Sequence, residues 1–266
     1  YYDSVGSRHA RPQRGLLTRP SVQELLDYRA NVDQRILKLL AKSPAELSAL
    51  SNREDFRLDQ LLTIGLHHEM QHQELFLTDI LHLLSHNPIP VSIIERPYQA
   101  HSASSIPSVM VSFEGGLVDI GLNDRQGDAP GDAWSNFSYD CEQPCHKVFL
   151  PPFKLASELV TNAQWLTFIE DGGYQDPLLW LSDGWSKRQR DEWQAPLYWQ
   201  CINGRWHQYG LDGLHPIELS APVAHISFYE AEAFARWSGK RLPREHEWEI
   251  VARDKAIEGV FLESRQ

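Results

Sequence analysis

The side chains best suited to chemistry lie in one short run, residues 65–75, which contains three histidines, two glutamates and two glutamines. Residues four apart lie on the same face of an α-helix, with about 5–6 Å between their Cβ atoms. His68 and His72 have this spacing. Imidazole nitrogens bind zinc, copper, iron and nickel, so the spacing alone does not name the metal. The run predicts a helix that supplies two nitrogen ligands to one metal ion.

The same residues also fit a second kind of metal site. His68 to His72 reads H-E-x-x-H, the zinc metalloprotease pattern in which Glu69 would be the general base. The pattern is incomplete, because neither the H-x-x-G-x-x-H extension nor an obvious glutamate on a following helix accompanies it. His82 and His86 stand four apart as well, but they adjoin the predicted helix end and lack a polar cluster, so we expect a solvated pair.

Three helices are predicted to position this run. Ser21 and Glu24 form a capping box, and apolar residues follow at helical spacing to about residue 40. A second capping box at Ser43 and Glu46 starts a shorter helix through about residue 50. The third helix begins near residue 55 and ends before the Asn-Pro pair at 87–88. Such helices with short connections favour an antiparallel bundle, in which metal ligands project inward.

The amino-acid composition changes after this helix. A stretch rich in Pro, Ser and His, with no helical or strand periodicity, predicts a linker. Beyond the linker, the sequence predicts short strands at 109–113 and 148–150 and helices at 162–169 and 227–237. Seven aromatic residues are expected in the core of this part: Phe113, Trp165, Phe168, Trp180, Trp185, Trp237 and Trp248. We therefore predict a multi-domain chain of α and α+β class, with a helical bundle at 1–95, a linker at 96–107 and an α+β domain at 108–266.

Composition excludes several classes of protein. The 266 residues carry a formal charge of −11, which argues against a nucleic-acid partner. No apolar stretch approaches the roughly 20 residues of a membrane span. Three cysteines and the lack of a signal-peptide pattern favour the cytoplasm. Cys141 and Cys145 have no second cysteine pair, so we expect ordinary thiols there.

A family resemblance becomes specific at residues 67–75, whose sequence HHEMQHQEL resembles the HHExQHQEL segment of the ergothioneine-synthase (EgtB-like) sulfoxide synthases. That family joins a DinB-like helical bundle to a C-type-lectin-like domain of the formylglycine-generating-enzyme (FGE-sulfatase) type. Further stretches resemble the region before its second bundle helix and its second domain: 1–6, 11–20, 137–140, 160–162, 171–174, 180–185 and 241–249. The resemblance extends over nearly the whole chain.

The resemblance implies a non-haem iron(II) enzyme with O2 as co-substrate, which joins a cysteine-type thiol to C2 of the imidazole of hercynine and gives a sulfoxide. His68 and His72 match two of the family's three iron ligands, and Gln71 matches a glutamine that contacts the hercynine imidazole. Arg11 and Arg14 match arginines that hold the carboxylates of the sulfur donor, although a solvated basic loop is the alternative for these residues. We expect small-molecule substrates, and neither nucleic acid nor membrane as partner.

The resemblance also implies that the chain is truncated at both ends. The third histidine ligand and the first bundle helix would precede residue 1, and the catalytic acid would follow residue 266, so no catalytic residue is assigned. Sibling enzymes on the same scaffold stay open, namely a selenoneine synthase or the ovothiol-pathway 5-histidylcysteine sulfoxide synthase. A non-catalytic ligand-binding module and the zinc metalloprotease-like site are the remaining alternatives.

Overall fold

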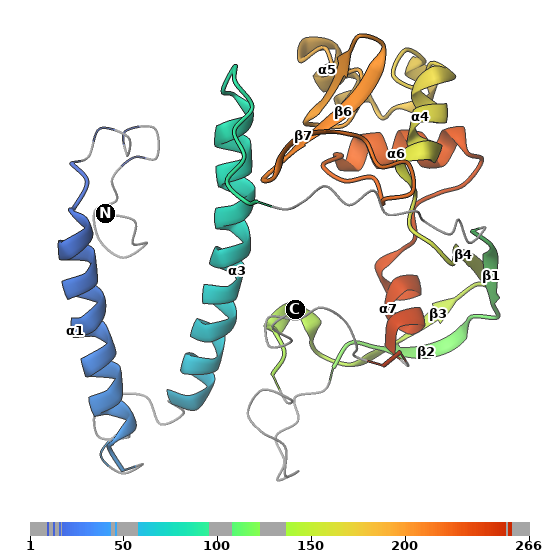
Figure 1. The fold of residues 1–266 in the computed structure, drawn as a ribbon. Helices are drawn as coiled ribbons and strands as arrows, with labels where there is room; N and C mark the ends of the chain where they lie inside the picture. Colours follow the sequence, from blue (N-terminus) through green and yellow to red (C-terminus); the bar gives the residue numbers. More distant parts are fainter. Residues whose placement is uncertain are drawn as a thin grey trace. The chain divides into compact units, whose positions relative to one another are not determined.

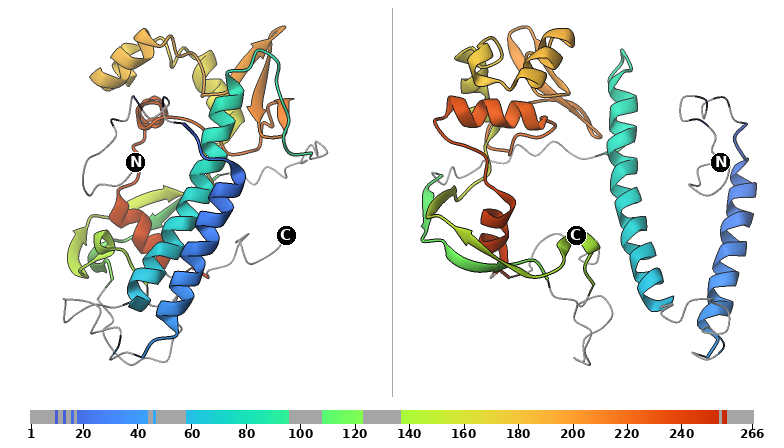
Figure 2. Two further views of the ribbon diagram at one scale, coloured as in Figure 1. Left: turned by 90° about the vertical axis from the view of Figure 1, so that its left-hand side faces the viewer. Right: turned by 180° about the vertical axis from the view of Figure 1, so that it is seen from behind.

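The computed structural model describes residues 18–43, 58–95, 108–122, 137–253 and 255–256, and the single positions 10, 13, 16 and 46. The chain divides into two units, residues 1–66 and 67–266, and the boundary lies within one long helix. Figures 1 and 2 show the elements of each unit as ribbons. In the parts described, no helix has both the length and the apolar character needed to cross a membrane.

Helix α1 (Val22–Leu40) begins at the predicted capping box. The side-chain hydroxyl of Ser21 accepts a hydrogen bond from the backbone N–H of Glu24 at 3.3 Å, and the Glu24 carboxylate accepts one from the Ser21 N–H at 2.7 Å. The second predicted box is present as well, because the Ser43 N–H donates to the Glu46 carboxylate at 2.8 Å. The helix predicted beyond it lies outside the described residues.

Helix α3 (Leu58–Ser85) is the predicted long helix, and it carries the histidine run at its middle. After it, residues 91–94 form hydrogen bonds within the second unit. The backbone N–H groups of Ile93 and Ile94 donate to the carbonyl of Leu211 at 2.9 and 3.1 Å. The hydroxyl of the buried Tyr209 donates to the carbonyl of Val91 at 2.7 Å. The segment that follows α3 is therefore held by hydrogen bonds to a hairpin far away in the sequence.

The second unit contains small antiparallel sheets in its described part. Strand β1 (Met110–Phe113) pairs with β4 (Phe153–Ala156), and β2 (Gly116–Ile120) pairs with β3 (His146–Leu150). A third sheet has the order β5 (Trp199–Ile202), β6 (Arg205–Gly210) and β7 (Gly213–Pro216). The predicted strands correspond to β1 and β3, whereas β2, β4, β5, β6 and β7 were not predicted.

Among the described residues, four α-helices accompany these strands: α4 (Asn162–Glu170), α5 (Ser182–Arg190), α6 (Phe228–Trp237) and α7 (Glu245–Arg253). Both predicted helices, 162–169 and 227–237, are confirmed as α4 and α6, and each starts at a capping box. Helix α7 lies beside β2 and β3 (Figures 1 and 2), where Glu249 accepts a hydrogen bond from the Gly121 N–H at 2.7 Å.

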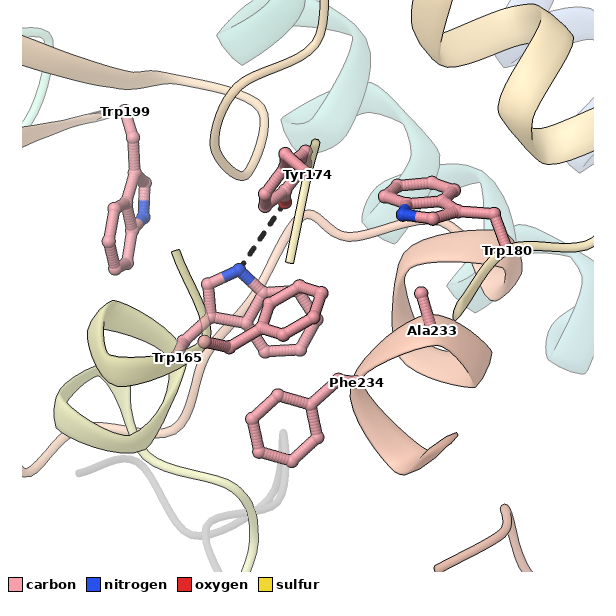
Figure 3. Packing of buried hydrophobic residues seen from close by; sticks show 7 residues of the cluster. Trp165, Tyr174, Trp180, Trp199, Ala233 and Phe234 are labelled. Carbon is pink, nitrogen blue, oxygen red and sulfur yellow. Dashed lines mark hydrogen bonds between the residues drawn. The ribbon is translucent and has the colours of Figure 1, made fainter. Parts of the chain in front are cut away.

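The core of the second unit is an aromatic cluster formed by Trp165, Phe168, Tyr174, Trp180, Trp199, Ala233 and Phe234 (Figure 3). Trp165 of α4 stacks on Phe234 of α6 with ring centroids 4.9 Å apart. A polar chain crosses the cluster: the Trp165 indole donates to the Tyr174 hydroxyl at 3.3 Å, which donates to the buried Glu230 at 2.7 Å. Burial and the Glu230 carboxylate raise the pKa of Tyr174 well above its ordinary value.

The aromatic prediction is confirmed for Trp165, Phe168 and Trp180, which are buried, and Trp185 and Trp237 pack partly buried against the cluster. It is wrong for Trp248, whose side chain is 62% exposed. Helix α7 turns the neighbouring Glu247 inward instead, and adjacent helical positions point about 100° apart. Burial of Glu247 therefore turns Trp248 toward the helix's exposed side.

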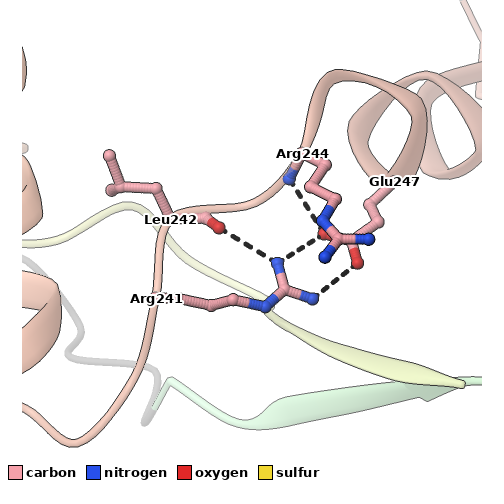
Figure 4. A network of polar contacts seen from close by, with 4 residues as sticks. All are labelled: Arg241, Leu242, Arg244 and Glu247. Carbon is pink, nitrogen blue, oxygen red and sulfur yellow. Dashed lines mark hydrogen bonds and ion pairs between the residues drawn. The ribbon is translucent and has the colours of Figure 1, made fainter. Parts of the chain in front are cut away.

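The buried Glu247 lies against Arg241 and Arg244 (Figure 4). The Arg241 guanidinium donates to both carboxylate oxygens, at 2.7 and 2.6 Å, and the Arg244 backbone N–H donates at 2.8 Å. The hydrogen bonds from Arg241 lower the pKa of Glu247 from 4.5 to about 2. We call this group the Glu247 clamp, and it fastens the 241–244 loop to the first turn of α7.

Candidate functional site

His68 and His72 lie one turn apart on α3, as predicted. Their imidazole rings meet edge to face, with centroids 4.5 Å apart and an angle of 79° between the planes. Both side chains are exposed. The spacing of histidines along a helix fixes this proximity, so it follows directly from the sequence. The two rings are close enough to offer nitrogen atoms to one ion, while the assignment of these histidines as metal ligands stays a prediction.

Both polar and apolar side chains lie near the pair. Gln71 is exposed next to His72, at the position that the resemblance assigns to substrate. A pocket of about 420 Å³ lies beside His72, and its described lining is Glu69, Gln73, Phe76 and Leu77 in addition to the histidine. The helix thus leaves open space next to one proposed ligand.

His67 makes a long-range contact that sequence reasoning missed. Its ring stacks on Phe137 with centroids 4.1 Å apart and planes 15° apart, and Tyr139 meets it edge-on at 6.2 Å. Phe137 and Tyr139 contact each other at 4.8 Å. The available signal was that residues 137–140 belong to a stretch resembling the family's second domain. The contact brings the histidine helix against that stretch.

The second histidine pair is exposed, as expected of a solvated pair, and its rings also make contacts that were not predicted. His82 and His86 are both exposed, yet their Nε2 atoms lie 3.2 Å apart and the His82 Nδ1 lies 3.2 Å from the hydroxyl of Tyr198. Burial raises the pKa of Tyr198. His82 therefore lies close to both His86 and Tyr198.

The described residues include two of the proposed metal donors, His68 and His72. In those ranges, no cluster of three or more His, Cys, Asp or Glu side chains could hold an ion. The neutral nitrogen donors of His68 and His72 suit iron(II) as two members of a larger ligand set. The other proposed site residues, Arg11 and Arg14, lie outside the described residues. Cys141, Cys145 and Cys201 are free thiols.

Comparisons with known proteins divide the chain in the same way as its composition does. Residues 98–263 match the sulfatase-modifying factor enzyme 1-like domain, and residues 1–76 match the DinB superfamily. The predicted fold class, a helical bundle region followed by an α+β domain of this type, is confirmed. The boundaries of the predicted domains and linker stay predictions.

Several curated relatives are hercynine oxygenases. The one from Mycolicibacterium smegmatis is 33% identical over 256 residues, which is 91% of this chain and 56% of the relative. The one from Mycolicibacterium thermoresistibile is 31% identical over 250 residues, 90% of this chain and 53% of the relative. A third, from Mycobacterium tuberculosis, is 42% identical over 112 residues, 42% of this chain and 26% of the relative. The chain spans about half the length of the first and second of these relatives.

Proposed function

We propose a function from the premise that this chain belongs to the sulfatase-modifying factor enzyme 1-like domain family, joined here to a DinB superfamily region. The combination matches the EgtB-like resemblance at residues 67–75, and relatives named hercynine oxygenase align over about nine-tenths of the chain. We infer that the chain is part of an oxidoreductase that acts on small molecules.

The proposed reaction is the O2-dependent joining of a cysteine-type thiol to C2 of the imidazole of hercynine. The thiol S–H and the C2–H bonds break, a C–S bond forms, one oxygen atom enters the sulfoxide and the other leaves as water. O2 accepts four electrons, two for the C–S bond and two for the sulfoxide. The observation that supports this chemistry is the paired imidazoles of His68 and His72, with centroids 4.5 Å apart on an exposed helix face.

Within this proposal, each residue has a physical role. His68 and His72 would supply two neutral nitrogen ligands to iron(II), which when bound supplies the redox chemistry that couples O2 to C–S bond formation. The exposed amide of Gln71 can donate to or accept from a substrate imidazole. Arg11 and Arg14 would grip carboxylates of the sulfur donor, because a guanidinium binds a carboxylate through two parallel hydrogen bonds.

Iron binding tests this assignment, and α3 provides a matched control. His72→Ala removes the second histidine of the proposed ligand pair, and His86→Ala removes the second histidine of the other pair on the same helix. We expect His72→Ala to lose iron(II) in equilibrium dialysis and His86→Ala to retain it, with the helical circular dichroism signal unchanged in both. Equal iron retention by the two variants would refute the ligand assignment.

Oxygen consumption by the full-length protein tests the reaction. We expect iron-dependent O2 uptake only when hercynine and a thiol are both present, and a comparison of cysteine with γ-glutamylcysteine identifies the donor. Tightly bound zinc with peptide cleavage would contradict the proposal. We also place the protein in the cytoplasm, because its three cysteines are free thiols, as expected where thiols are kept reduced.

A further inference from the structure

A pocket of about 700 Å³ lies in the second unit, and none of its described lining residues belongs to α3. It is formed by the loop that leads into β5, by β6 and by the segment before and into α6. We call it the tryptophan pocket. The residues that carry the argument are Glu192, Trp193, Tyr198, Trp199, Trp206 and His225.

Aromatic rings form much of its wall. Trp199 and Trp206, neighbours on β5 and β6, have ring centroids 5.9 Å apart with planes tilted by 54°. Tyr198 and His225 meet edge to face at 4.9 Å. Burial lowers the pKa of His225, which favours its uncharged form. Walls of this kind attract organic cations, because the face of an aromatic ring carries partial negative charge.

The described lining of the pocket is acidic, and Lys187, which lies outside the lining, has its Nζ 5.8 Å from the centroid of the Trp193 ring. The described lining contains three carboxylates and neither lysine nor arginine. Asp191 is held by Lys187 and Arg190, and Glu230 accepts hydrogen bonds from Tyr174 and Ser227. Glu192 has no ion pair or hydrogen bond with any residue in the described ranges. Its carboxylate is therefore available to a cation in the pocket.

Trp199 adds a donor that needs an acceptor. The residue is only 8% exposed, and its Nε1 has no hydrogen-bond partner among the described residues. Figure 3 shows this nitrogen on the side of the ring nearest Tyr174, whose hydroxyl contacts Glu230, another lining residue. Buried indole N–H groups normally donate to an oxygen. A molecule in the pocket that carries an oxygen atom would supply this acceptor.

The backbone of the lining is also unusual. Glu192, Tyr198 and His225 have φ values of 55°, 74° and 59°, a region that side chains with a Cβ rarely occupy. Residues in such conformations cluster at ligand-binding sites, where the surrounding structure holds them in place. The backbone conformations of these three residues therefore fix the positions of the Glu192 carboxylate and of the Tyr198 and His225 rings.

We propose that the tryptophan pocket binds a small organic ammonium ion that also carries an oxygen acceptor. The aromatic rings surround the ammonium group, Glu192 balances its charge, and the Trp199 N–H donates to the oxygen. The site goes beyond the proposed oxygenase function and does not depend on it.

Choline, its uncharged isostere 3,3-dimethyl-1-butanol and tetramethylammonium test the proposal by isothermal titration calorimetry. Choline should bind at least about fivefold more tightly than the isostere, because only choline gains the attraction of the rings and Glu192. Glu192→Gln should weaken choline binding severalfold, whereas Glu170→Gln, an exposed glutamate outside the pocket, should leave it unchanged. Equal affinity for choline and the isostere, or no choline binding at millimolar concentrations, would overturn the proposal.

Trp199→Phe separates the two contacts, because it keeps a ring and removes the N–H donor. We expect it to weaken choline while leaving tetramethylammonium, which has no oxygen, almost unaffected. Equal losses for both ligands would refute the role of the N–H group. His72→Ala should bind choline as the unmodified protein does. The proposal can therefore stand or fall separately from the iron site.

Discussion

Replacement of Glu247 by glutamine should measure the strength of the Glu247 clamp. The native pKa of about 2, against an ordinary value of 4.5, corresponds to about 3 kcal/mol at roughly 1.36 kcal/mol per pKa unit. The Arg241 side chain is 54% exposed, so solvent screening reduces this figure. We expect Glu247→Gln to lower the free energy of unfolding by about 2 kcal/mol at pH 7.

The pH dependence gives a second, independent reading. Because the native pKa of Glu247 is lowered, its contribution is fully present above pH 4.5 and disappears as the pH falls toward 2. The difference between the unmodified protein and Glu247→Gln should therefore shrink to about half or less between pH 7 and pH 3. Urea denaturation followed by tryptophan fluorescence at each pH measures this difference.

Glu245→Gln is the matched control, since Glu245 is exposed in the same first turn of α7. It should cost less than about 1 kcal/mol, the range of a charge near a helix N-terminus. Two results would refute the reasoning: equal losses for the two variants at pH 7, or a Glu247→Gln difference that stays constant between pH 7 and pH 3.

The remaining predictions concern packing. A methyl group at Gly173 would overlap the ring of Phe168, so Gly173→Ala should destabilise the protein by about 1–3 kcal/mol. Gly65 lies in the interior of α3, and a methyl group there would meet no neighbouring atom, so Gly65→Ala should stabilise the protein by about 0.5–1 kcal/mol. Melting curves check both, and shifts of the same sign would contradict the packing argument. Tyr174→Phe should cost about 1–3 kcal/mol, because the buried Glu230 loses a donor. An unchanged urea midpoint would count against that hydrogen bond.

The sequence predicted those parts of the fold that depend on interactions between residues close together in the chain. The helix starts at Ser21 and Ser227 each depend on hydrogen bonds between residues three apart, and the one at Ser21 was predicted as a capping box. Strand pairing depends on distant partners such as Gly116 and Leu150, which face each other across β2 and β3. Short strands with irregular burial give no period to detect, so five of them were missed.

In the candidate site, too, the contact between nearby residues was predicted and the contact between distant residues was not. The proximity of His68 and His72 follows from helical geometry, and the structure places their rings together. The stacking of His67 on Phe137 joins residues far apart in the sequence, and no spacing rule could indicate it. The prediction that Trp248 is buried was wrong for a different reason. Hydrophobicity predicted its burial, but the neighbouring Glu247 is buried and paired with Arg241, and this orientation of the helix leaves Trp248 exposed.

The hydrogen bond from Tyr209 to Val91 determines where the polypeptide can be dissected. Tyr209 is 2% exposed, so a fragment beginning after Val91 would leave a buried hydroxyl without its acceptor, at about 1–3 kcal/mol. The same cut would come close to the Ile93 and Ile94 anchors on Leu211. A recombinant fragment that carries the matched domain should therefore start upstream of Val91, even though the match itself begins at residue 98.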